Sequence, residues 1–393
     1  MNILFVHAIG KNKFGGGEKW VIMAGCGLRD LGHRVWVGGR SGSRLLAMAR
    51  EHGLETVPMN VLSDLSLWHC MKIARFIRRN GIDTIIARER ELGVAGLAAK
   101  MAAGVTRAGA PAVKGGKPDA VKDEAPVKMV VKPVVLSRHG LPLRSSIRKH
   151  VWLLKCFADG LITNAKSTRE IYEHNNWFRK DFIHLLYNGV NPPGATNEYD
   201  FSARFPGKKI ILSVGRLARQ KGFCHLIDAM ARLRGQHDDL QLVILGEGKM
   251  KRQLKALARK KKVADRVHFQ GFVQDVSPYL AGADLFVLPS LYEGMPNAAM
   301  EAMAHGKPVV ITGVDGASEL VPDPGKGRLV PPKNPEAICE AIRTYLENPE
   351  LRATTGQNAR EYVLQHFSAR RMTEELHQLI LEKHELKNGP DAG

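Results

Sequence analysis

Short apolar runs alternate with longer amphipathic segments along most of the chain. Residues 3–8 (ILFVHA) form an apolar run, 18–31 have helical periodicity, and 35–37 are apolar again. A strand, a helix and a second strand in this order form a βαβ unit, whose two strands are parallel. The pattern therefore predicts an α/β fold that begins with a parallel sheet.

The same alternation continues through the first half of the chain. Further strands are predicted at 84–87, 134–137 and 160–164, and further helices at 70–79, 93–103, 147–157 and 167–175. The rhythm breaks at residues 106–133, which are rich in Ala, Pro, Gly and Lys. Because such a composition is typical of surface segments, we expect an inserted mobile loop there.

The βα pattern starts again after the sequence PPG at 192–194, which is typical of a linker. Strands are predicted at 209–214, 240–245, 267–269, 285–288 and 309–312, and helices at 335–346, 348–365 and 368–386. We therefore expect two doubly wound, Rossmann-like domains that face each other across a cleft, at 1–190 and 191–367. The charged segment 368–393 is expected to form a helix that crosses back to the first domain.

Charge is the unusual feature of the composition. The 393 residues carry a formal net charge of +19, and residues 1–200 hold 30 Lys and Arg against 17 Asp and Glu. A basic first half favours acidic partners, namely an anionic lipid surface, phosphorylated saccharides or nucleic acid. The alternative is a solvated surface that charge keeps soluble.

The five scattered cysteines, without CxxC spacing, are typical of reduced thiols in a cytoplasmic protein. The first ten residues lack the features of a signal peptide, and no run of about 18 uncharged apolar residues occurs. A cytoplasmic location is therefore expected.

Residues 285–304 (LFVLPSLYEGMPNAAMEAMA) predict a buried strand, a tight loop and a helix. Pro296 suits the first helical position because proline has no N–H to lose there, and the free N–H groups of the next turn favour an anion. Glu293 and Glu301 lie on either side of this helix start. They are suited to the hydroxyl groups of a phosphorylated sugar or nucleotide, or to the acid and base of a glycoside hydrolase. Glu301 alone would also complement the helix dipole.

Arg216 and Lys221 follow the predicted strand 209–214, beside Gly215. Two cations at the end of a strand can neutralise a diphosphate, although each alone is typical of a surface charge. No DxD motif occurs, and no group of His, Asp and Glu has the spacing of metal ligands. The sequence therefore indicates no bound metal.

Two features of the first half are candidates for the same cleft. The glycines at 15–17 allow either the close approach of a phosphate or a tight turn, and without the last glycine of GxGxxG they do not support a dinucleotide site. His139 follows the predicted strand 134–137, at the sheet edge where α/β proteins bind ligands. A structural or solvated role explains a loop histidine equally well.

Taken in order, these motifs resemble the family-four glycosyltransferases of the GT-B fold, a large family of retaining nucleotide-sugar transferases. The family's E-x7-E motif corresponds to Glu293 and Glu301 within EGMPNAAME, and its G-R-x4-K-G pattern to residues 215–222. The segments GGGEK, YNGV, LGEG and FQGFV and the turn at 306–308 follow in the family's order. The resemblance covers nearly the whole chain, apart from 106–133.

The resemblance implies a role for individual residues. Glu301 would hold the ribose, Arg216 and Lys221 the diphosphate, and Glu293 with the following backbone the sugar, while Phe272 and Val273 would line the base pocket. Gly16 and Gly17 would approach the donor from the first domain, and His139 would lie beside the reacting centre. The implied catalytic residues are His139, Glu293, Arg216 and Lys221. The implied donor-binding residues are Gly16, Gly17, Gly215, Gly246, Glu247, Phe272, Val273, Gly294, Met295, Pro296, Asn297 and Glu301.

The implied activity is the retaining transfer of a sugar from a nucleotide-diphosphate sugar, such as a UDP-sugar, without a metal or other cofactor. A saccharide or lipid-linked acceptor of lipopolysaccharide or polysaccharide biosynthesis is expected. The basic first domain fits peripheral contact with the anionic inner face of a membrane. The alternatives are a sugar-nucleotide epimerase of similar fold, or a basic protein that binds membranes or nucleic acid. Aromatic residues are only 6% of the chain and dispersed, which argues against nucleic acid.

Overall fold

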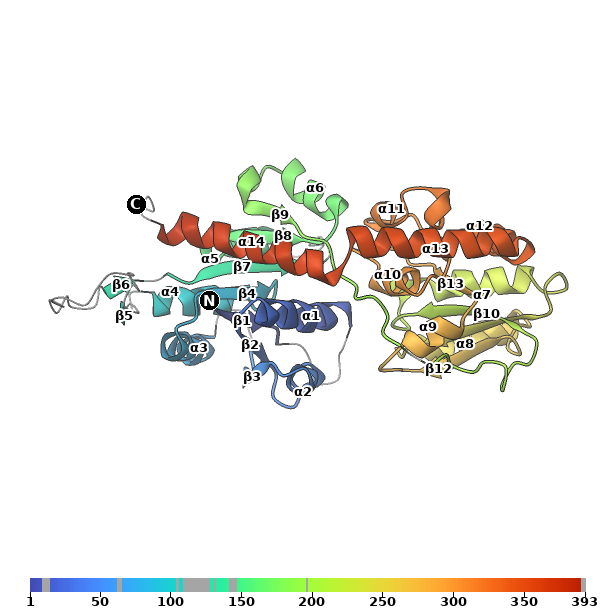
Figure 1. The fold of residues 1–393 in the computed structure, drawn as a ribbon, viewed down its shortest axis with the longest axis horizontal. Coiled ribbons are helices and arrows are strands. Elements are labelled where there is room, and N and C mark those ends of the chain that lie inside the picture. The colour runs from blue at the N-terminus through green and yellow to red at the C-terminus, as the bar shows by residue number, and fades with distance from the viewer. Residues whose placement is uncertain are drawn as a thin grey trace, which may run out of the picture.

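The computed structural model describes residues 1–8, 15–61, 66–103, 106–108, 128–130, 132–140, 147–195 and 197–389. Two lobes lie end to end, each built on a twisted sheet covered by helices (Figure 1). Each sheet has one apolar core layer on each of its faces. Burial on both faces explains why the strands are continuous apolar runs and show no alternation of polar and apolar residues.

The first sheet has the strand order β3-β2-β1-β4-β7-β8-β9, and all its strands are parallel. Its strands are β1 (Asn2–Val6), β2 (Arg34–Gly39), β3 (Glu55–Pro58), β4 (Thr84–Arg88), β7 (Val134–His139), β8 (Gly160–Thr163) and β9 (Ile183–Leu185). The helices are α1 (Gly16–Asp30), α2 (Arg44–Glu51), α3 (Leu67–Asn80), α4 (Leu92–Ala102), α5 (Ile147–Phe157) and α6 (Lys166–His174), with a 3₁₀ turn η1 (Lys180–Phe182).

The second sheet has the order β12-β11-β10-β13-β14-β15 and is also parallel. Its strands are β10 (Lys209–Val214), β11 (Leu240–Leu245), β12 (Val267–Gly271), β13 (Leu285–Leu288), β14 (Val309–Thr312) and β15 (Arg328–Val330). The helices are α7 (Phe223–Arg232), α8 (Lys251–Lys260), α9 (Ser277–Gly282), α10 (Asn297–Ala304), α11 (Ala317–Leu320), α12 (Pro335–Glu347), α13 (Pro349–His366) and α14 (Ala369–Asn388). Two 3₁₀ turns are η2 (Arg219–Lys221) and η3 (Pro324–Lys326).

Both sheets reverse their strand order beside a central strand. In the first sheet β1 lies between β2 and β4, and in the second β10 lies between β11 and β13. A reversal of this kind leaves a crevice at the carboxyl ends of the strands, where open α/β sheets bind ligands. The fold thus has one such crevice in each domain.

The end of the chain ties the two lobes together. After α13 the chain crosses to the first lobe, where α14 packs along α1 (Figure 1). The crossing point is an isolated bridge between Val190 and Ser368, with hydrogen bonds of 2.8 Å from Val190 N to Phe367 O and 2.9 Å from Ala369 N to Val190 O. The two chain segments that connect the domains, at Val190 and Ser368, are therefore hydrogen-bonded to each other where they cross.

The structure corrects the expectation of a plain loop at 106–133. The two ends of this insertion pair as the antiparallel strands β5 (Thr106–Ala108) and β6 (Lys128–Val130). The sequence KMVV at 128–131 contains the β-branched residues that favour a strand. Residues 109–127 and 131 lie outside the described part, so the expectation of a mobile loop is untested there.

Close packing of α1 on α14 depends on a glycine. A Cβ placed on Gly27 would lie 2.6 Å from Thr373 Cγ2 and 2.9 Å from its Cβ. Gly27→Ala is expected to lower the free energy of unfolding by about 1–3 kcal/mol, because over-packing forces side chains or backbone to shift. Urea unfolding would measure the change.

Thr373→Ala in the same chain should recover part of this loss, since it removes the two outer atoms of the clash. Gly194→Ala is the matched control, because a Cβ there has no neighbour within 4 Å. Equal effects of the alanine at Gly27 and at Gly194 would contradict the packing argument.

Candidate functional site

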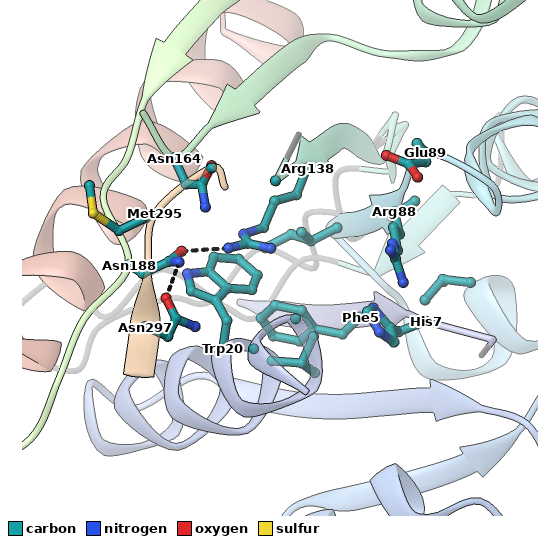
Figure 2. A pocket seen from close by; sticks show the side chains of 18 of the residues that line it. Phe5, His7, Trp20, Arg88, Glu89, Arg138, Asn164, Asn188, Met295 and Asn297 are labelled. Carbon is teal, nitrogen blue, oxygen red and sulfur yellow. Dashed lines mark hydrogen bonds between the residues drawn. The ribbon is translucent and has the colours of Figure 1, made fainter. Parts of the chain in front are cut away.

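A cavity of about 260 Å³ lies between the two domains, at the carboxyl ends of β1, β4 and β7. The first domain supplies most of its wall, and four residues of the second domain close it from the other side (Figure 2). Six residues predicted from the sequence line it, and these are Gly16, Gly17, Glu293, Gly294, Met295 and Asn297. The structure thus brings the glycine segment and the EGMPN loop together.

Glu293 is the most firmly held of these residues and only 8% exposed. Its Oε1 accepts hydrogen bonds from Lys221 Nζ and, at 2.7 Å, from Ser290 Oγ. Its backbone N–H donates to Asp315 Oδ2 at 2.7 Å. Since Lys221 lies behind the carboxylate, the cavity meets a paired ion at this wall.

The helix after this loop starts one residue later than predicted. Pro296 is the N-cap of α10, with φ −79° and ψ 80°, and Asn297 is the first helical residue. The ψ of Pro296 is not helical, so the proline closes the loop and does not occupy the first turn. Glu301 lies further along α10, where Lys19 Nζ of the first domain donates to its Oε1 at 2.6 Å.

Both glutamates of the E-x7-E motif are therefore engaged by a lysine. Lys221 on Glu293 belongs to the same domain, whereas Lys19 on Glu301 crosses the cleft. The two lysines occupy carboxylate oxygens that the expected roles assign to sugar and ribose hydroxyls. A ligand with hydroxyl groups would have to displace or share these lysines.

The remaining second-domain residues predicted from the sequence do not line the cavity. Arg216 is exposed and donates to Gln220 Oε1 at 3.3 Å, while Lys221 lies over Gly215, whose added Cβ would be 3.3 Å from Lys221 Cδ. Gly246 has φ +141° and lies against the carbonyl of Gly215, where a side chain would not fit. The exposed Glu247 pairs with Lys251 at 2.7 Å.

Phe272 and Val273, expected at a base pocket, also lie outside the cavity. The Phe272 ring is 45% exposed and carries the guanidinium of Arg44, from the first domain, 4.2 Å from its centroid. Val273 packs against the core of the second domain. A flat group could only stack on Phe272 by replacing or joining Arg44.

The glycine segment brings the start of α1 against the second domain. A Cβ on Gly16 would lie 2.6 Å from Asn297 Nδ2, and one on Gly17 would lie 3.5 Å from His7 Cε1. Glu18, three residues after Gly15, accepts the Gly15 N–H at 2.8 Å. Residues 9–14, which complete this loop, are not described.

A buried pair follows β1. His7 Nε2 lies 3.2 Å from Glu18 Oε1, and both residues are over 90% buried. Burial lowers the pKa of His7 in spite of its carboxylate partner. Burial opposes ionisation of Glu18, but the hydrogen bond from His7 leaves its pKa below the ordinary value. The pair is thus a neutral imidazole that donates its Nε2–H to a carboxylate.

His139, expected beside the reacting centre, is not part of the cavity wall. Its imidazole is fully buried, 3.0 Å from Ser137 Oγ and 2.8 Å from Tyr172 Oη, and it does not line the cavity. Burial lowers the pKa of His139 to about 3, so the ring stays neutral. Side chains of β7 alternate between the two faces of the sheet, and the face toward α1 belongs to the neighbouring Arg138.

Sequence reasoning missed most of the first-domain wall. Arg138 Nη2 donates to Asn188 Oδ1 at 2.6 Å, and Asn188 Nδ2 donates to Asn297 Oδ1 at 2.6 Å (Figure 2). The other polar residues missed on this wall are His7, Trp20, Arg88, Glu89 and Asn164. His7, Arg88, Arg138 and Asn164 lie at or directly after the carboxyl ends of parallel strands, so strand ends were the available signal.

Residues 196–362 match the family described as "Glycosyl transferases group 1". This part of the chain is therefore similar to a group 1 glycosyltransferase domain. The chain is 33% identical over 227 residues to the lipopolysaccharide core biosynthesis glycosyltransferase LpsE of Rhizobium meliloti. The aligned residues are 57% of this chain and 65% of that protein.

A second relative of this chain is N-acetylgalactosamine-N,N'-diacetylbacillosaminyl-diphospho-undecaprenol 4-alpha-N-acetylgalactosaminyltransferase of Campylobacter jejuni. It is 34% identical over 206 residues, which are 52% of this chain and 55% of that protein. The matches thus span between half and two thirds of these relatives.

Among solved structures, Anabaena Alr3699/HepE in complex with UDP-glucose has a TM-score of 0.80 at 21% identity, covering 97% of this chain and all of that one. The expected GT-B fold, with two Rossmann-like domains, is thereby confirmed. Within the described residues, no helix combines the length and the apolar character needed to cross a bilayer.

Glu91, at the N-cap of α4 close behind Arg88, makes stability depend on pH. Its carboxyl is 3% exposed, and burial raises its pKa to about 7. The folded protein therefore keeps a proton on Glu91 that the unfolded chain releases near pH 4.5. This extra proton binding stabilises the folded state fully below about pH 4.5, and the stabilisation is lost as the pH rises through 7.

Glu91→Gln should consequently raise the free energy of unfolding by about 1–3 kcal/mol at pH 8 and change it little at pH 5. Chemical unfolding at both pH values measures the effect, with the exposed Glu170→Gln as the control. An equal effect of Glu91→Gln at the two pH values would disprove the raised pKa.

Proposed function

We propose that this protein is a retaining glycosyltransferase that uses a nucleotide-diphosphate sugar, a UDP-sugar in our expectation, and needs no metal ion. The observation that carries the proposal is the E-x7-E loop and helix, which place Glu293 on the cavity and Glu301 on the cleft within a group 1 domain. Anabaena Alr3699/HepE, which shares the fold, has a solved complex with UDP-glucose.

The second domain would bind the donor. Its ribose hydroxyls would take the place of Lys19 on Glu301, and the sugar would lie at the cavity beside Glu293 and the backbone of residues 294–297. Arg216 is exposed, and a diphosphate would replace its 3.3 Å hydrogen bond to Gln220. Lys221 lies between Gly215 and Glu293. A positive charge delivered at this point would stabilise the negative charge of the leaving group.

Transfer would then follow from closure of the two domains. An acceptor hydroxyl in the first-domain part of the cavity would meet the anomeric carbon, with water excluded by the loops at 16–17 and 293–297. The departing phosphate oxygen would take the proton of the attacking hydroxyl, so the new bond forms on the face that the old one leaves. Neutral His7 would line this side of the cavity.

A saccharide or lipid-linked acceptor is part of the proposal, in lipopolysaccharide or polysaccharide synthesis. It is supported by the names of the two relatives, which refer to lipopolysaccharide core and to a diphospho-undecaprenol substrate. The net charge of +19 supports contact with an anionic membrane surface, at the inner face in a cytoplasmic protein. An epimerase would differ by converting its nucleotide sugar without an acceptor.

Lys221→Ala is expected to lower turnover of the nucleotide sugar by roughly 10²–10³-fold, because one cation at the leaving group is lost. Release of the nucleoside diphosphate measures the rate, and Lys326→Ala, which breaks the exposed pair with Asp323, is the matched control. Full turnover by Lys221→Ala would refute the assignment of this cleft, and activity lost in EDTA and restored by Mg²⁺ would refute metal independence.

Glu301→Gln and Lys19→Ala should change donor binding in opposite directions. Glu301→Gln removes the charged carboxylate that would accept hydrogen bonds from the ribose hydroxyls, and is expected to weaken UDP binding about 10–100-fold. Loss of Lys19, which competes for the same carboxylate from the facing domain, is expected to strengthen it by up to about fivefold. Calorimetric titration with UDP measures both, with Glu336→Gln as the control. Parallel weakening in both variants would show that Lys19 assists the donor.

A further inference from the structure

Two arginines lie side by side on the first-domain wall of the cavity. Arg88 ends β4 and Arg138 belongs to β7, and the register of the two strands pairs these residues directly. Both line the cavity together with Gly140 and Trp20. Paired residues of neighbouring strands thus bring two positive charges to the wall of one cavity, and like charges on paired residues are destabilising.

The surroundings of Arg138 satisfy only part of its guanidinium. Nη2 donates to Asn188, and the group lies 4.0 Å from the centroid of the Trp20 ring. Arg138 Nε and Trp20 Nε1 are both buried and have no hydrogen-bond partner among the described residues. Two unsatisfied N–H donors on one wall call for an acceptor, because buried donors without partners are costly.

No carboxylate within the described ranges forms an ion pair with Arg138 or Arg88, although Glu18 and Glu89 lie close enough to act on Arg138 electrostatically. Burial and, to a lesser extent, the positive charge of Arg88 lower the pKa of Arg138 to about 9. A purely structural role would explain the stacking on Trp20 and the bond to Asn188. It would not explain the unpartnered Nε or the second arginine.

These cations are separate from those assigned to the donor. Arg216 and Lys221 follow β10 in the second domain, whereas Arg88 and Arg138 belong to the first-domain sheet on the opposite side of the cavity. Arginine is suited to bidentate recognition of phosphate and carboxylate. We infer that the acceptor carries a phosphate or carboxylate group, which Arg138 and Arg88 bind while its hydroxyl faces the donor. This inference rests on the proposed function, since it names the class of acceptor.

Binding of small anions tests the inference without turnover. Inorganic phosphate, glucose 6-phosphate, glucuronate and neutral glucose would be titrated while thermal stability is followed, both with saturating UDP and in the Lys221→Ala protein. Saturating UDP is expected to occupy both second-domain cations, and the Lys221→Ala protein lacks one of them. Phosphate and the two charged sugars are expected to raise the thermal stability of the protein, and neutral glucose is expected to leave it unchanged. The ratio of the affinities for glucose 6-phosphate and glucuronate then distinguishes a phosphate site from a carboxylate site.

Arg138→Gln and Arg88→Gln should each weaken this anion binding by at least tenfold, and the exposed Arg179→Gln should leave it unchanged. Arg88 is half-buried and does not hold Asn188, so Arg88→Gln keeps the test valid if Arg138→Gln fails to fold. Anion binding that survives in Arg88→Gln, or neutral glucose binding as well as its charged analogues, would overturn the inference. Failure of UDP to bind would instead count against the proposed function, because anion binding to the Lys221→Ala protein does not depend on UDP.

Discussion

The close approach of the two domains at their strand ends is the constraint on which the rest of this structure depends. A side chain on Gly294 would overlap the carbonyl oxygen of Gly140, and one on Gly16 would lie 2.6 Å from the Asn297 amide. At Gly294 backbone therefore meets backbone across the cleft, and at Gly16 backbone meets the side chain of Asn297. Because these two glycines have no side chains, the EGMPN loop can close a cavity whose other walls belong to β1, β4 and β7.

This closeness also explains the ion pair between Lys19 and Glu301. Lys19 reaches Glu301 only because α1 begins beside α10, and it leaves the ion pair half open to solvent, with side-chain exposures of 37% and 21%. Lys221 and Glu293 are far less exposed, at 17% and 10%. An exposed pair contributes little and is easily broken, whereas separating a buried pair leaves an uncompensated charge. The end of the cleft at Lys19 and Glu301 is thus the part that a ligand can enter most readily.

The continuous apolar runs were enough to predict the architecture. Strands 209–214, 240–245, 285–288 and 309–312 have the predicted bounds, because strands buried on both faces show no competing pattern. The three-residue strands β9 and β15 and the mostly polar helix α8 were not predicted, since short or weakly apolar segments carry too little signal. The E-x7-E motif identified the second-domain residues that line the cavity, namely Glu293, Gly294, Met295 and Asn297.

The first-domain half could not be predicted in the same way. Alternation along β7 shows that Arg138 and His139 face opposite ways, but only the packing of α1 decides which of them meets the cavity. The neighbourhood of Arg88 and Arg138 depends on strand register, and that of Lys19 and Glu301 on the meeting of two domains. The roles assigned to Glu301, Arg216, Phe272 and Val273 remain predictions.

The hydrogen bonds from Arg138 through Asn188 to Asn297 run across the connection between the domains. Asn188 belongs to neither sheet and lies just before the crossing point at Val190. A ligand that draws the Arg138 guanidinium away from Asn188 would disturb a chain of hydrogen bonds that ends on Asn297 in the second domain. By thermodynamic linkage, a donor bound to the second domain that changed the affinity for a ligand at Arg138 would have its own affinity changed by the same factor. Occupancy of one domain would in this way be communicated to the other by a single amide.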